Sequence, residues 1–129
     1  MAAKKLRVPY WVVTVLFLLP MAGSGVPELL FERPASTAAA FAHLGYPLYL
    51  LRMLGLAKVL GAVAIVSNRS RTLKEWAYAG YVFNLLGATA SHLIVGDGLF
   101  AAVPAIMLVL VLISYCLWSR AAVAQTTSA

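Results

Sequence analysis

Residues 99–118 read LFAAVPAIMLVLVLISYCLW, a run of 20 residues without a charged side chain. A helix of about 20 apolar residues is long enough to cross the hydrocarbon core of a bilayer. Further apolar runs lie at about 8–30, 47–66 and 73–95, and residues 31–46 form the longest connection. The sequence therefore predicts an all-α integral membrane protein, a four-helix transmembrane bundle that forms one domain over the whole chain of 129 residues.

The composition agrees with a membrane protein rather than a soluble one. Hydrophobic residues make up 63% of the chain and charged residues 11%, whereas a soluble domain of this length has more surface to cover with charge. The net charge of +6 comes largely from residues that flank apolar runs: Lys4, Lys5, Arg7, Arg69, Arg71 and Lys74. This placement indicates membrane topology and contact with the lipid bilayer, and no nucleic-acid partner is expected.

Lysine and arginine alternate between the connections as the positive-inside rule describes. The amino-terminal segment has three, residues 31–46 one, residues 67–74 three, the last turn none and the carboxyl-terminal tail one. Trp11, Trp76 and Trp118 fall near the same predicted side, and indole rings favour the membrane interface. We therefore expect a multi-pass protein of a bacterial-type plasma (inner) membrane, with both termini in the cytoplasm.

Several residues indicate where the predicted helices begin and bend. Pro9 suits the first turn of a helix, and Pro20 predicts a kink within the first span. Ser36 is a suitable cap for a short helix on the membrane surface within the longest connection. Thr72, followed three residues later by Glu75, predicts a capping box at the start of the third span.

The amino-terminal run has a second interpretation, a signal peptide cleaved near residue 25. Basic residues, an apolar stretch and small residues from Ala22 to Gly25 fit such a peptide. Apolar sequence continues to Phe31, which favours a retained span. Amino-terminal sequencing of the mature protein decides between the two interpretations.

Lys58 lies near the middle of the second predicted span, where a charged side chain needs a partner or a function. Gly55 and Gly61, three residues to either side, allow another helix to approach, so we expect Lys58 to face the inside of the bundle. Away from the predicted midplane lie all four acidic residues: Glu28, Glu32, Glu75 and Asp97. The expected partners of Lys58 are therefore Asn84, backbone carbonyls freed by Pro20, or water, and we weigh a structural role equally against a ligand-binding one.

Gly80, Asn84, Gly87 and Ser91 follow steps of four, three and four residues, so they share one face of the third predicted span. We interpret the two glycines as sites of close helix packing. Asn84 lies near the predicted depth of Lys58. Like Ser91, it is an equal candidate for an interhelical hydrogen bond and for a ligand pocket.

A second polar group is expected at the outer end of the bundle, around an outward-facing mouth. His92 and Asp97 are predicted to meet Glu28 and His43 there. Together with the residues above, the candidates for a ligand pocket are Lys58, Asn84, Ser91, His92, Glu28, His43 and Asp97. The histidines and acids show no diagnostic ligand spacing, so no metal site is predicted.

Two segments carry a resemblance to a known family. One is His43-Leu-Gly-Tyr-Pro-Leu-Tyr-Leu with Leu54-Gly-Leu-Ala-Lys-Val-Leu-Gly61; the other is Leu73-Lys-Glu-Trp-Ala-Tyr-Ala-Gly80 with the later pairs Gly87-Ala and Ser91-His92. In combination, over Val8 to Trp118, the chain resembles the DoxX-like family of small four-span membrane proteins. The resemblance implies a four-helix membrane bundle. It implies less about activity, because founding members look like subunits of a thiosulfate:quinone oxidoreductase while others resemble membrane chaperones and cargo receptors.

We favour a module, without catalytic activity of its own, that binds a lipophilic small molecule or a partner membrane protein in a polar intramembrane pocket. The alternative is a quinone-interacting subunit of a membrane redox complex, in which Lys58, Asn84 or His92 bonds a quinone carbonyl. No cofactor is encoded by a motif, so the electrons would come from another subunit or a soluble donor. A multidrug-type transporter is disfavoured because the first span has no acidic residue before Glu28. A homodimer is compatible with the small-residue faces.

Overall fold

The computed structural model describes residues 2–30 and 35–127, and these residues form helices and connections without a strand. In chain order the helices are α1 (Ala2–Leu30), α2 (Ala35–Leu44), α3 (Tyr49–Ser67), α4 (Arg71–Ile94) and α5 (Gly98–Thr127). The predicted all-α fold is confirmed.

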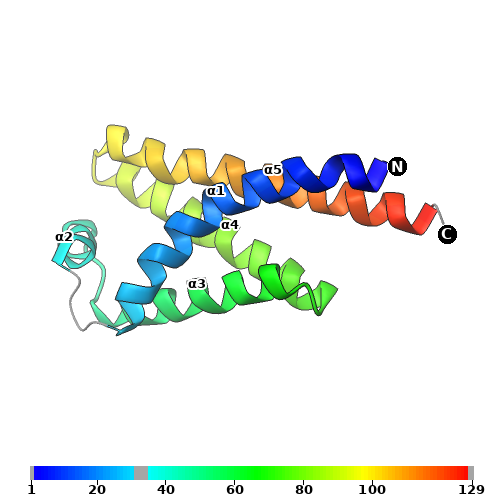
Figure 1. Ribbon diagram of the computed structural model, residues 1–129. Coiled ribbons are helices and arrows are strands. Elements are labelled where there is room, and N and C mark those ends of the chain that lie inside the picture. Colours follow the sequence, from blue (N-terminus) through cyan, green and yellow to red (C-terminus); the bar gives the residue numbers. More distant parts are fainter. Residues whose placement is uncertain (1, 31–34, 128–129) are drawn as a thin grey trace.

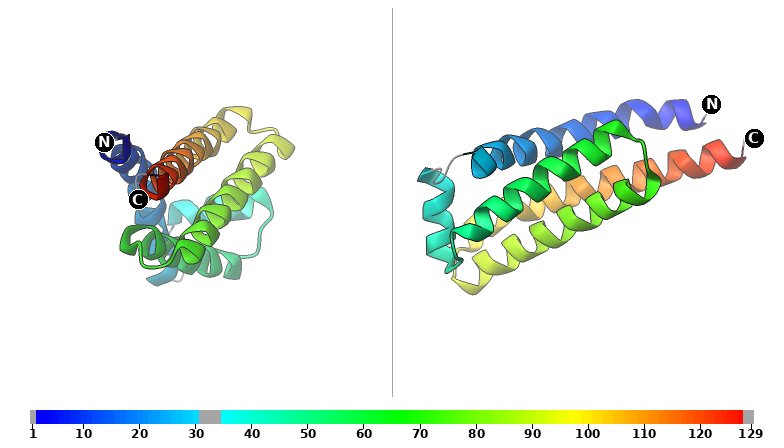
Figure 2. Two further views of the ribbon diagram at one scale, coloured as in Figure 1. Left: turned by 90° about the vertical axis from the view of Figure 1, so that its right-hand side faces the viewer. Right: turned by 90° about the horizontal axis from the view of Figure 1, so that it is seen from below.

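The four long helices form an up-and-down bundle (Figure 1). Helix α1 packs against α3 and α5, and α4 packs against the same two neighbours from the opposite corner. Both termini and the α3–α4 connection lie at one end, and α2 lies across the other end (Figure 2). Short connections between consecutive long helices favour this antiparallel arrangement of neighbours.

Three helices are long and apolar enough to cross a membrane: Ala3–Leu30, Tyr49–Ser67 and Gly98–Thr127. Helix α4 has 24 residues, which gives it sufficient length, but it is less apolar and has Arg71, Lys74 and Glu75 in its first turns. The structure therefore supports several membrane-spanning helices. The fourth span and the cytoplasmic position of the termini stay predictions.

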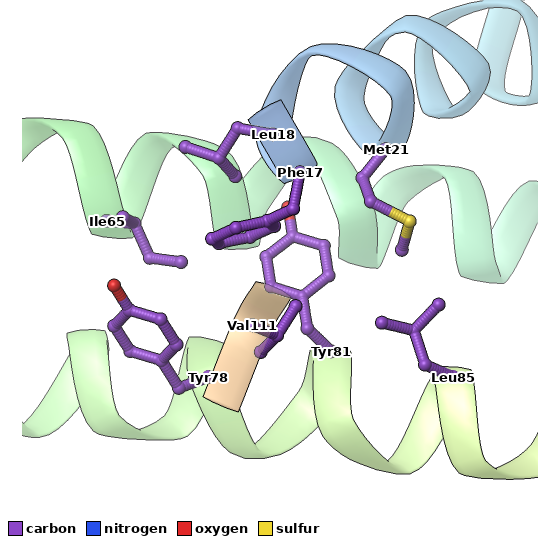
Figure 3. Close-up of a cluster of buried hydrophobic side chains, with 8 residues drawn as sticks. All are labelled: Phe17, Leu18, Met21, Ile65, Tyr78, Tyr81, Leu85 and Val111. Carbon is purple, nitrogen blue, oxygen red and sulfur yellow. The ribbon is translucent and has the colours of Figure 1, made fainter. Parts of the chain in front are cut away.

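The centre of the bundle is an apolar core to which all four long helices contribute (Figure 3). Its fully or nearly buried members are Phe17, Leu18, Met21, Ile65, Tyr78, Tyr81, Leu85 and Val111. The ring of Phe17 lies 5.7 Å from that of Tyr81 in an edge-on contact and 6.3 Å from that of Tyr78. This contact joins the diagonal helices α1 and α4 through the middle of the bundle. Large apolar side chains such as Phe83 and Leu99 face outward, as expected for a lipid environment.

Helix α1 begins at Ala2, so the prediction that Pro9 occupies its first turn is wrong. The preceding residues, including Lys4 and Lys5, have good helix propensity and extend the helix towards the amino terminus. Pro20 lies inside α1, and the ribbon of α1 bends in its middle (Figure 1). Proline lacks a backbone N–H and its ring crowds the preceding turn, which accounts for the bend.

Two predicted helix caps are also wrong. Helix α2 begins at Ala35, before Ser36, although a short helix in this connection is confirmed. Helix α4 is capped by Ser70, which has an extended backbone and whose Oγ accepts the N–H of Leu73 at 3.3 Å. Thr72 therefore lies within the helix, and Glu75 accepts instead from Nε of Arg71 at 3.3 Å. Serine and threonine are both good caps, and a choice between two so close in sequence depends on where the preceding helix ends.

Candidate functional site

An ion pair between Glu28 and Lys58 lies inside the bundle, with α1 and α3 each contributing one member. Nζ of Lys58 is 2.8 Å from Oε1 and 2.9 Å from Oε2 of Glu28. The side chain of Glu28 is only 1% exposed and that of Lys58 14%. Placing Glu28 near the outer face, without contact to Lys58, was therefore wrong. The expected bonds of Lys58 to Asn84 or to carbonyls near Pro20 are also absent among the described residues.

The two charges meet because α1 and α3 cross at glycine residues. A side-chain carbon on Gly55 would lie 2.8 Å from the carbonyl oxygen of Gly25, and one on Gly25 would lie 2.9 Å from Cβ of Lys58. Only glycine permits this approach of two backbones. Glu28 follows Gly25 by three residues and Lys58 follows Gly55 by three, so both side chains project from the crossing. Glycines around Lys58 were predicted to admit another helix, and for Gly55 this is confirmed.

All three protons of the Lys58 ammonium have acceptors on α1. Besides the two carboxylate oxygens, Nζ donates to Oγ of Ser24 at 3.2 Å. Ser24 directs its own proton to the carbonyl of Met21 at 3.0 Å, which leaves its oxygen free to accept. Because an ammonium group has three donors, this arrangement saturates Lys58 and gives the pair no net charge.

A cavity of about 300 Å³ opens between α3 and α4, beside this pair. Its walls are mostly apolar, and Lys58, Trp76, Gly80, Tyr81 and Asn84 are among the residues that line it. The hydroxyl of Tyr81 donates to the backbone carbonyl of Lys58. The side chain of Asn84 has no hydrogen-bond partner among residues 2–30 and 35–127, although it is partly buried. A carboxamide with open donors and acceptor in an apolar cavity is a group that can orient a ligand.

The predicted stripe on α4 is present, but its glycines do not pack against another helix of this chain. No atom lies within 4 Å of a side-chain carbon built on Gly80 or Gly87, so the interpretation as close packing is wrong. Gly80 instead lines the cavity with Asn84. Ser91, at the end of the stripe, donates to the carbonyl of Gly87 at 2.7 Å.

At the end of the bundle where α2 lies, the structure brings His43, Asp97 and His92 together. Nε2 of His43 is 2.6 Å from Oδ2 of Asp97, and Nδ1 of His92 is 3.5 Å from the same oxygen without a hydrogen bond. Ser91 is joined to this end by the hydroxyl of Tyr46, at 2.5 Å from its Oγ. The polar group predicted there is confirmed for these four candidates. Glu28, the fifth, belongs to the pair with Lys58.

Within the described part of the chain, no three histidine, cysteine or acidic side chains are arranged to hold a metal ion. Tyr46 was missed as a member of the group because tyrosine near a membrane interface is common. The pairing of Tyr46 with Ser91 depends on how α2 folds back over the bundle, which no spacing in the sequence predicts.

A hydroxyl chain at the other end of the bundle was also missed. Thr14 donates to the carbonyl of Tyr10 at 2.6 Å, so Oγ of Ser114, 2.7 Å away, must donate to Thr14. The hydroxyl of Tyr78 then donates to Ser114 at 2.7 Å. Thr14 and Ser114 are fully buried, and this chain satisfies their hydroxyls while it joins α1, α4 and α5.

Lys74 was interpreted as an exposed topology charge, and its side chain is instead buried. Residue exposure is 1%, and Nζ donates to Oδ1 of Asn68 at 3.0 Å. The same nitrogen lies 5.0 Å from the ring centre of Tyr10 and 4.8 Å from that of Trp118. Aromatic faces attract a cation at this range, so Lys74 ties the α3–α4 connection to α1 and α5.

Comparison with known families agrees with this architecture. The model of the DoxX-like family matches residues 12–114, a range that includes every candidate site residue and most of the four long helices. Comparisons with curated proteins and with solved structures find no match. Since the family match extends over well more than half of the chain, this membrane protein belongs to the DoxX-like family.

Proposed function

We propose that the cavity between α3 and α4 binds a lipophilic small molecule that carries a polar head. The observation that carries this proposal is Asn84, a carboxamide without a hydrogen-bond partner among the described residues, on the wall of an apolar cavity. A polar group in lipid surroundings is costly unless it is bonded, so a ligand head that bonds Asn84 is favoured over an apolar chain. The volume of about 300 Å³ is in the range of small-molecule sites.

The geometry narrows the contacts available to a quinone. Lys58 has all its donors directed at α1, and His92 belongs to the group at the far end of α4. Of the three residues considered for a quinone carbonyl, Asn84 alone has open donors at the cavity. A quinone is thus one member of the proposed ligand class. A redox role would require electrons from another protein.

A partner membrane helix is the other occupant to be tested. Gly80 and Gly87 leave the surface of α4 open, and small residues favour helix association in lipid. The two occupants differ in mass, which a single measurement separates.

Native mass spectrometry of the full-length protein, released gently from its membrane, tests the proposal. We expect the wild type to retain a bound small molecule, which the variant Asn84→Leu loses. Thr89→Val is the matched control, because Thr89 is also on α4 but its hydroxyl bonds the carbonyl of Leu85 in its own helix at 2.8 Å. Equal retention by the wild type and Asn84→Leu would refute the role of Asn84, and a protein dimer or heterodimer without small molecule would favour the partner helix.

A further inference from the structure

We infer that the cavity selects neutral lipids whose head carries a hydroxyl or a primary amide, and that Glu28 sets this selectivity by neutralising Lys58. This inference rests on the proposed function and names the class of ligand. It goes beyond that proposal because Glu28 does not line the cavity itself.

The first step concerns charge. Lys58 lines the cavity, and a lysine there would by itself favour an anionic head such as a carboxylate or a phosphate. Both carboxylate oxygens of Glu28 lie within 2.9 Å of its Nζ, and Ser24 takes the remaining proton. An anionic head would therefore enter low-dielectric surroundings without an available counter-charge, which is strongly unfavourable.

A cationic head is excluded for a related reason. Glu28 is 1% exposed and is covered by the crossing of α1 and α3, where a side-chain carbon on Gly55 would lie 2.8 Å from Cβ of Glu28. A ligand in the cavity cannot reach that carboxylate without separating the two helices. The pair thus presents neither sign of charge to the ligand.

The second step concerns hydrogen bonding. The carboxamide of Asn84 has two donors and an acceptor, and the hydroxyl of Tyr81 does not compete for them because it donates to the carbonyl of Lys58. A hydroxyl or an amide both donates and accepts, so it matches Asn84 fully. A ketone, ester or quinone carbonyl only accepts, which leaves the oxygen of Asn84 unpaired, and an unpaired buried acceptor lowers affinity.

Trp76 gives the test its signal, because it lines the cavity. The probes are dibrominated stearyl alcohol, the matching primary amide, the matching methyl ester and the matching carboxylate, which share one chain and differ only in the head. Bromine quenches tryptophan fluorescence on contact. Full-length protein in phosphatidylcholine nanodiscs is titrated at alkaline pH, where the carboxylate is ionised. The variant Trp76→Phe measures the quenching of the other tryptophans, which is subtracted.

For the wild type we expect the alcohol and the amide to bind at least about tenfold more tightly than the carboxylate, since a buried unpaired charge costs more than that factor. The ester is expected to bind more weakly than the alcohol. Glu28→Gln leaves the Lys58 ammonium without its counter-charge, so the carboxylate should gain about tenfold or more in affinity in that variant.

The outcomes separate the inference from the proposed function. Binding of the carboxylate as tightly as the alcohol by the wild type overturns the selectivity, whether or not Glu28→Gln folds. Unchanged carboxylate affinity in a folded Glu28→Gln variant overturns the role of Glu28. If no probe quenches the wild type more than Asn84→Leu, the cavity is not a binding site and the proposed function itself fails.

Discussion

Replacing Lys58 by methionine leaves Glu28 as a carboxylate without a counter-charge inside the bundle. Methionine is chosen because its unbranched chain resembles the stem of lysine, which packs against Gly25 at the crossing of α1 and α3. The change therefore removes the ammonium group while most of the packing is kept. The double variant Lys58→Met with Glu28→Gln removes both charges and retains a hydrogen-bonding side chain at position 28.

The expected loss follows from the contacts that Lys58→Met deletes. Two hydrogen bonds to a charged acceptor disappear, at 2.8 and 2.9 Å, and each such bond contributes about 1.5–3 kcal/mol. Since the carboxylate is 1% exposed, water does not replace them. Measured losses on breaking buried pairs, about 3–5 kcal/mol, agree with that sum, and the double variant should recover to within about 2 kcal/mol of the wild type.

The assay is unfolding by SDS in mixed micelles, with helix content followed by circular dichroism. It gives the free energy of unfolding for the wild type, the two single variants and the double variant, and hence the coupling energy between the residues. A cost below about 1 kcal/mol for Lys58→Met would refute the buried pair. A double variant no more stable than Lys58→Met would refute it equally.

Three further predictions concern the crossing, the hydroxyl chain and α2. Gly55→Ala should lower the free energy of unfolding by about 1–3 kcal/mol in the same assay, because its new carbon would meet backbone 2.8 Å away, whereas Gly80→Ala, with nothing within 4 Å, should not destabilise. Tyr78→Phe should cost about 1–2 kcal/mol through its lost bond to a buried serine, and Tyr115→Phe, at a half-exposed tyrosine, about zero; equal costs would contradict the network. His43→Ala should speed hydrogen exchange in α2 without changing it in α4, and unchanged exchange in α2 would show that the bond to Asp97 does not hold that helix.

The long apolar helices were predictable because a bilayer requires them. Residues 99–118 contain no charge, and no fold other than a helix satisfies such a backbone in lipid. Helix α4 was predicted as a helix for a different reason, the three- and four-residue steps from Gly80 to Ser91. These steps establish one face of the helix, but they do not say whether that face meets a neighbour or a cavity.

The partner of Lys58 was not predictable from depth alone. Glu28 was placed near the outer face because the longest connection was thought to start there, and the helix in fact includes it and ends at Leu30. The pair also depends on the bend of α1 and on the crossing at Gly25 and Gly55. Residues about 30 positions apart on different helices share no period, so the sequence offers glycines as a hint of a crossing and no register for it.

The group at the α2 end was easier to anticipate. His92 and Asp97 lie close in sequence at the α4–α5 turn, and His43 lies in the connection that must return to the same end of the bundle. Topology alone therefore brings them near one another. Lys74 shows the opposite case, since a basic residue beside an apolar run is read as a topology charge unless its aromatic neighbours are known from the fold.

Photolabelling tests most directly whether the cavity between α3 and α4 binds a lipophilic molecule. The full-length protein in lipid nanodiscs is irradiated with a diazirine derivative of stearyl alcohol, with and without an excess of unlabelled alcohol, and labelled peptides are identified by mass spectrometry. We predict labels within residues 54–64 and 73–84 that the excess removes, and labels on the lipid-facing sides of α1 and α5 that it does not. Labelling of all four long helices to the same extent, unaffected by competitor, would contradict a binding site at this cavity.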